Sequence, residues 1–140
     1  MTEPAVMGMH QCKWVTGTTT KMFNLWRIDD ASGYKVMSSS ETGSNYLVPV
    51  DKKAIVLSCT ITLSGTGATY QGIALYEHTV ASSAGGTALW KYYTPLVSGD
   101  GANVVFTIPM YIEISAGNYI NFQHDSGLIR ESMLVLECDA

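Results

Sequence analysis

The feature that most constrains this chain is an alternation of side chains over residues 54–63. Ile55, Leu57, Cys59, Ile61 and Leu63 alternate there with Ala, Val, Ser and Thr. A period of two places such side chains on one face of a β-strand, whereas a helix would scatter them around its circumference. The segment therefore predicts a strand with one face on a hydrophobic core.

Shorter alternations predict further strands. Val104, Phe106 and Ile108 alternate up to Pro109, where we expect the strand to end because proline has no N–H to donate to a ladder. The final strand is expected over 132–138, with Leu134, Leu136 and Cys138 on one side. Weaker strand candidates are 11–16, 20–28, 34–37, 46–50, 72–78 and 89–93. The segment 20–28 also fits a short helix, but its Thr-rich entry and Phe23 favour a strand.

Glycine and small polar residues separate these segments and predict turns. Ile112 and Ile114 precede Ser-Ala-Gly-Asn at 115–118, and the alternation resumes after it, which predicts a hairpin with positive φ at Gly117 or Asn118. Further turns are expected at 65–67, 82–86 and 99–101. About nine or ten strands with almost no helix predict an all-β, single-domain antiparallel β-sandwich of jelly-roll type. We expect this domain over 10–140, preceded by an N-terminal arm over 1–9.

Charge is scarce in this sequence. Charged residues are 14% of the chain, against about 25% in ordinary soluble domains. Because charge keeps isolated domains soluble, we expect part of the surface to be covered by sister subunits or a larger partner; the alternative is a monomer with a Ser/Thr-rich face. The net charge is −4 and the eight Lys and Arg residues are scattered, which argues against nucleic acid as a partner. No apolar run is long enough to predict a membrane span.

The cysteines and the other reactive residue types predict no catalytic site. Cys12, Cys59 and Cys138 are an odd number without close spacing, which fits synthesis in a reducing cytoplasm; a bridge between Cys12 and Cys138 is an alternative. His124-Asp125-Ser126 contains the residue types of a hydrolase triad, but neighbours on a strand point to opposite faces. His10 and Cys12 would share one face of a strand and could hold zinc with a third ligand, but the sequence offers no second pair at ligand spacing. We therefore expect no enzyme activity, no cofactor and no metal.

Aromatic residues are the remaining candidates for a binding site. Trp90, Tyr92 and Tyr93 cluster near the middle of the chain, where exposed rings on a rigid sheet would suit sugar stacking or protein anchoring. The alternative is that Trp90 and Tyr92 fill the core and Tyr93 caps it. Trp14 and Trp26 lie in the first predicted strands and are candidates for a subunit boundary.

Two segments of the sequence resemble a known family. Val-Pro-Val-Asp-Lys-Lys-Ala-Ile-Val-Leu at 48–57 resembles the "VPxGKKAxL" strand entry of small jelly-roll or tumour-necrosis-factor-like β-sandwich proteins of tailed-bacteriophage virions. Tyr-Ile-Glu-Ile-Ser-Ala-Gly-Asn-Tyr-Ile at 111–120 is similar to their "Y-I-x-I-x-A-G-x-Y-I" segment. The usual glycine of the first motif is Asp51 here, which changes the turn but not its position.

The resemblance implies a virion accessory protein made in the host cytoplasm. Proteins of the family that it resembles decorate capsids, often as trimers, or cap tails and fibres. The compactness expected of this chain favours a capsid decoration (cement) protein, a homotrimer bound to the major capsid protein across capsomers. The alternative is a receptor- or glycan-binding module of a phage tail or fibre, using Trp90, Tyr92 and Tyr93.

Overall fold

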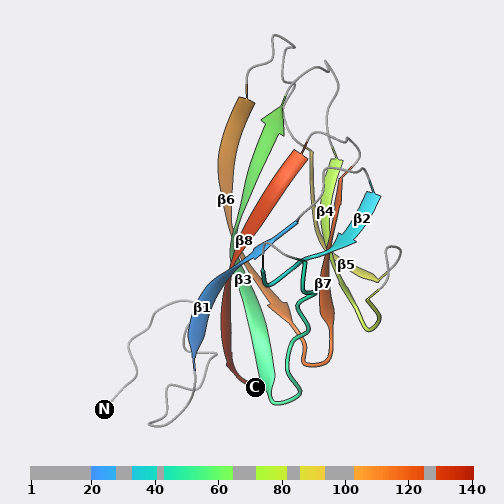
Figure 1. Ribbon diagram of the computed structural model, residues 1–140, viewed down its shortest axis with the longest axis vertical. Coiled ribbons are helices and arrows are strands. Elements are labelled where there is room, and N and C mark those ends of the chain that lie inside the picture. The colour runs from blue at the N-terminus through green and yellow to red at the C-terminus, as the bar shows by residue number, and fades with distance from the viewer. Residues whose placement is uncertain are drawn as a thin grey trace.

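A computed structural model describes residues 20–27, 33–40, 43–64, 72–81, 86–93, 103–124 and 129–140. Within these ranges the chain forms eight strands and no helix (Figure 1). In chain order the strands are β1 (Lys21–Trp26), β2 (Gly33–Val36), β3 (Lys52–Ser64), β4 (Gly72–His78), β5 (Thr87–Tyr93), β6 (Asn103–Ile114), β7 (Tyr119–His124) and β8 (Ile129–Asp139). The all-β prediction is confirmed. The arm at 1–9 and the candidate strand at 11–16 lie outside the described residues.

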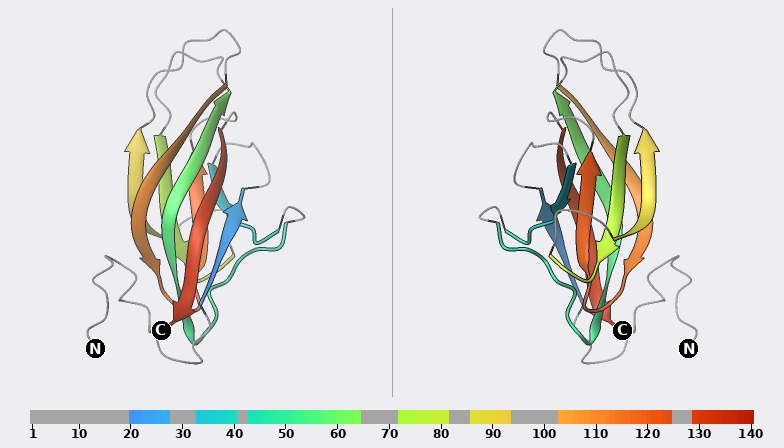
Figure 2. Two further views of the ribbon diagram at one scale, coloured as in Figure 1. Left: turned by 90° about the vertical axis from the view of Figure 1, so that its left-hand side faces the viewer. Right: turned by 90° about the vertical axis from the view of Figure 1, so that its right-hand side faces the viewer.

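The strands form two four-stranded antiparallel sheets that face each other in a sandwich (Figures 1 and 2). Sheet A has the order β1-β8-β3-β6, and sheet B has the order β2-β7-β4-β5. Only β4 and β5 are neighbours both along the chain and within a sheet, so every other connection passes from one sheet to the other. An eight-stranded sandwich with such crossing connections is a jelly roll.

The core lies between the two sheets and is built from the inward side chains of both. Phe122, Ile73 and Leu75 of sheet B pack with Ile61 and Met133 of sheet A, and all five are at most 2% exposed. Burying a side chain of this size contributes roughly 1.5–3 kcal/mol relative to leaving it in water. The inward faces supply the hydrophobic contact that holds the sheets together.

A register shift at Leu57 divides the alternating stripe of β3 into two halves. Pairing with both β6 and β8 shifts between Val56 and Ser58. Because an extra residue reverses the facing of a strand, Val56 lies in the main core together with Cys59 and Ile61. Ile55 and Leu57 instead join a second cluster on the other face of sheet A. The prediction that all the large side chains of 54–63 share one face is therefore wrong.

The second cluster also contains the last strand's predicted stripe. Leu136 and Cys138 share one side of β8, as expected, but they pack with Ile55 on the outer face of sheet A. Met133 and Val135, which precede Leu136 and face the opposite side of β8, enter the main core. Cys138 is disulfide-bonded, which departs from the expectation of three reduced cysteines. Cys12, the other end of the bridge considered from sequence, lies outside the described residues.

The turn at 115–118 has the predicted local geometry but does not close a hairpin. Gly117 has a φ of 78°, and the Asn118 amide donates to the Ser115 carbonyl at 3.3 Å. However, β6 pairs with β3 in sheet A, whereas β7 pairs with β2 and β4 in sheet B. Local turn chemistry is the same for a hairpin and for an arch between sheets, so the sequence pattern could not separate them.

Pro109 lies inside β6 and does not end it. The strand continues to Ile114, and Pro109 pairs with Ser58 at the register shift. Because β6 is an edge strand of sheet A, a residue without an N–H is tolerated there.

The connection from β2 to β3 closes one side of the sandwich. Trp26 and Ser38 exchange backbone hydrogen bonds of 2.9 and 2.8 Å, and the Tyr46 amide donates to the Met37 carbonyl at 3.0 Å. Met37, Tyr46 and Val48 are buried in the main core. The candidate strand at 46–50 is thus an ordered connection with isolated bridges, not a strand.

The two segments that carry the family resemblance meet in space. The Gly117 amide donates to the Val48 carbonyl at 2.9 Å, and the Val48 amide donates to the Asn118 carbonyl at 3.0 Å. Ala54 pairs with Ile114 where β3 and β6 lie side by side. The segments 48–57 and 111–120 therefore form one hydrogen-bonded unit at one end of the sandwich.

Candidate functional site

Among the described residues no backbone bridge joins β5 to β6, and we call this side of the sandwich the open edge. β5 ends sheet B and β6 ends sheet A, and both strands lie toward the same side of the sandwich in Figure 2. Exposed large apolar side chains gather on these two strands: Tyr92 is 39% exposed, Tyr93 73%, Val105 61% and Tyr111 40%. We refer to Tyr92, Val105 and Tyr111 as the edge patch.

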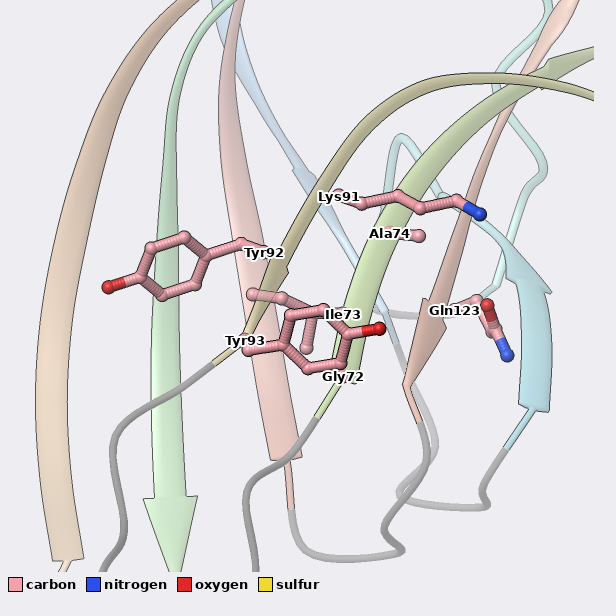
Figure 3. A pocket seen from close by; sticks show the side chains of 7 residues that line it. All are labelled: Gly72, Ile73, Ala74, Lys91, Tyr92, Tyr93 and Gln123. Carbon is pink, nitrogen blue, oxygen red and sulfur yellow. The ribbon is translucent and has the colours of Figure 1, made fainter.

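The aromatic cluster of β5 is divided between the two faces of sheet B. Trp90 pairs with Leu75 and Tyr92 with Ile73, both inward-facing residues of β4. The rings of Trp90 and Tyr92 stack on each other, with centroids 5.7 Å apart and planes 6° from parallel, and Trp90 packs against the main core. Tyr93 points the other way, onto the outer face (Figure 3). The three predicted aromatics therefore do not form one binding platform.

A hollow of about 110 Å³ lies on sheet B beside Tyr93. Lys91, Ala74 and Gln123 are directly opposite one another across β5, β4 and β7, and Gly72 is opposite Tyr93. Small residues on β4 between longer side chains on its neighbours create the depression, which Figure 3 shows. The sequence alone does not single out Lys91 and Gln123, because only the register of three strands brings them together.

The other predicted aromatic residues have different positions. Trp26 ends β1, is half-buried and joins the closed side of the sandwich through its backbone bridge to Ser38. Its place at a subunit boundary stays a prediction. Trp14 lies outside the described residues.

Buried polar groups inside the sandwich form pairs. Arg27 Nε lies 3.3 Å from Glu131 Oε1, and both side chains are at most 1% exposed. The Tyr46 hydroxyl donates to Glu137 Oε2 at 2.6 Å, and Lys21 Nζ lies 3.3 Å from Glu137 Oε1.

Burial, with a smaller contribution from Glu131, raises the pKa of the Cys59 thiol, so this free cysteine is neutral at physiological pH.

The described histidines do not share a site. His124 pairs with Ile73 at one end of β4, whereas His78 pairs with Tyr119 at the other end. His78 Nδ1 accepts a hydrogen bond of 2.9 Å from the Val80 amide. Among the described residues, no three His, Cys, Asp or Glu side chains gather where they could hold a metal ion. No described helix is long and apolar enough to cross a membrane.

The strand order defines the chain as an eight-stranded jelly-roll sandwich with one closed and one open edge. No family model matches the sequence, and the comparison with curated proteins finds no match. Among solved structures, the chain is similar to a protein in "Structure of infectious bursal disease virus Gx strain", with 10% identity and a TM-score of 0.39. The match covers 87% of this chain and 32% of that one, so this chain spans about a third of its length. A likeness at this level carries no information about function.

Proposed function

We propose that this chain is a bacteriophage virion protein that decorates the capsid, as a homotrimer bound to the major capsid protein across neighbouring capsomers. Two features support the proposal. The segments 48–57 and 111–120, which resemble virion accessory proteins, pack against each other as one unit. The jelly roll is also an architecture that viral capsid domains use, although lectins and cupins share it.

The observation that carries the proposal is the open β5–β6 edge with its edge patch. Val105 is 61% exposed on β6, and a monomer gains nothing from displaying such an apolar side chain at an edge that also carries the partly exposed Tyr92 and Tyr111. Covering these side chains with a neighbouring subunit removes apolar area from water, and each Å² removed stabilises the contact by roughly 25 cal/mol. Because the chain has few charged residues, such a contact would remove few charged groups from water.

Light scattering after size exclusion tests the self-association. We expect the wild-type protein to have three times the chain mass of 15.2 kDa. Val105→Asp places a charge in the edge patch and should give monomers. Val50→Asp is the matched control, because Val50 is 90% exposed but lies in the β2–β3 connection, so this variant should remain trimeric. A monomeric wild-type protein, or a trimer that Val105→Asp leaves intact, contradicts this part of the proposal.

The capsid location has a separate test. Electron microscopy should compare particles assembled with and without the gene that encodes this chain. We expect density between capsomers only in the first sample, and earlier rupture of the second on heating. Density on the tail or fibres instead overturns the capsid assignment and supports the receptor-binding alternative.

A further inference from the structure

The hollow on the outer face of sheet B has the chemistry of a ligand site, and Tyr92 is the one edge-patch residue that also lines it. Gly72 and Ala74 form its floor, and Tyr93, Lys91 and Gln123 rise around it (Figure 3). In the figure the Lys91 side chain passes across β4 near Ala74, and Gln123 lies on the far side of Ala74, on β7. The floor is rigid because β4 is hydrogen-bonded on both sides, to β5 and to β7.

Tyr93 supplies an apolar platform at this hollow. Its side chain is 73% exposed, so a face of the phenol ring is available to a ligand. A sugar ring presents C–H groups on one face and hydroxyls around its rim. Such a ring stacks on an exposed aromatic side chain and leaves its hydroxyls free for polar neighbours.

Gln123 supplies a neutral hydrogen-bonding group. The Tyr76 hydroxyl lies 3.5 Å from Gln123 Oε1, in the geometry of a donor to that oxygen. Because this interaction engages the oxygen, the amide N–H groups are left to donate. A ligand hydroxyl or carboxylate over Ala74 is a suitable acceptor.

Lys91 supplies a positive charge that no carboxylate among the described residues pairs with. Lys21, Arg27, Lys52 and Lys53 each have a carboxylate partner. Lys91 has none among the residues that the structure describes, although the chain as a whole is acidic. A cation held beside an aromatic platform, in a protein of net charge −4, selects for an anionic ligand.

We propose that this hollow binds a carboxylated pyranose, such as a hexuronate or a sialate residue of a surface glycan. The C–H face of the sugar stacks on Tyr93, its carboxylate pairs with Lys91, and a neighbouring oxygen accepts from the Gln123 amide. The inference does not depend on the proposed capsid location, since either a capsid or a fibre protein can carry such a site.

The test is an NMR titration of the uniformly ¹⁵N-labelled protein with glucuronate, N-acetylneuraminate, glucose and acetate. We expect both acidic sugars to shift amide resonances of Lys91, Tyr93 and Gln123 with millimolar affinity, and glucose and acetate each to bind about tenfold more weakly. Equal affinity for acetate reduces the site to a nonspecific anion contact and overturns the proposal, as does the absence of shifts with both acidic sugars.

Variants separate the roles of the residues. Lys91→Met should weaken acidic sugars about tenfold without changing glucose binding, and Tyr93→Ala should weaken both kinds of sugar roughly threefold to tenfold. Val50→Ala is the control, because Val50 is 90% exposed in the β2–β3 connection and lines neither the hollow nor the edge patch, so this variant should leave every affinity unchanged. Unfolding curves establish that each variant is folded. The oligomeric state is measured independently, so failure of the sugar site is distinguishable from failure of the trimer.

Discussion

Two buried carboxylates each have a specific partner in this protein. Arg27 follows β1 of sheet A, pairs with Glu131 of β8, and also donates from Nη1 to the Phe122 carbonyl of β7 at 3.1 Å. One side chain therefore connects both sheets. Glu137, near the other end of β8, accepts from the Tyr46 hydroxyl, which joins the β2–β3 connection to sheet A. The first pair ties the end of β1 to β8, and the second ties the β2–β3 connection to β8.

Tyr46 makes the protein less stable as the pH becomes alkaline. Burial, with the hydrogen bond to Glu137 and its charge, raises the pKa of Tyr46 above its ordinary value of 10.0. The pKa is raised only in the folded state, so protonated Tyr46 stabilises the fold fully below pH 10. This stabilisation is lost as the pH rises above 10. We expect Tyr46→Phe to flatten this decline and to lower the free energy of unfolding at pH 7 by about 1.5–3 kcal/mol.

Urea unfolding between pH 7 and 11 measures both effects. Tyr93→Phe is the control, because removing an exposed hydroxyl should leave the curve unchanged. Equal pH slopes for the wild-type protein and Tyr46→Phe contradict the prediction.

At the scale of elements, the register shift in β3 decides which side chains enter the core. Before Leu57 the residues facing the main core are Ala54 and Val56, and after it they are Cys59 and Ile61. A sheet twists more strongly at such a point, and both faces of β3 bury apolar side chains. The strand therefore serves two clusters, one between the sheets and one on the outer face of sheet A.

Alanine substitutions in β3 test the shift. In an unbroken alternation Val56 would share the face of Thr60 and Thr62, but the structure buries it completely. We expect Val56→Ala to destabilise the protein by about 2 kcal/mol, and Thr62→Ala by no more than about 0.5 kcal/mol. Chemical denaturation measures both, and equal losses contradict the register shift.

At the scale of the whole molecule, the topology joins strands that are far apart in the sequence. β1 pairs with β8 and β3 with β6, while β4 and β5 form the one hairpin among the described strands. Long loops must close before such pairs gain hydrogen bonds, and this entropy slows folding. The sandwich therefore forms as a unit, with its non-local pairs depending on one another.

Refolding kinetics test whether the non-local strand pairs form together. We expect refolding from urea to take milliseconds to seconds, as in other all-β sandwiches, with fluorescence of Trp90 and far-ultraviolet dichroism changing together. A Trp90→Phe variant identifies the fluorescence signal. Refolding within microseconds, or strand formation well before the change in Trp90, contradicts it.

The alternation of side chains by itself determined much of this protein. It predicted an all-β sandwich and located strands close to their observed bounds at β1, β2, β4 and β5, because a pleated backbone turns successive side chains to opposite faces. It also identified the turn at 115–118 and its glycine, since φ preferences are local properties.

The tertiary structure decided what local patterns cannot encode. Sheet membership made β6–turn–β7 a crossing and not a hairpin, and an extra residue in β3 relative to β8 reversed the facing of the alternating side chains over 54–63. The register across β5, β4 and β7 brought Lys91 and Gln123 to Tyr93. These outcomes depend on which strands pair, and pairing is settled by the joint burial of side chains far apart in the chain, which no single segment contains.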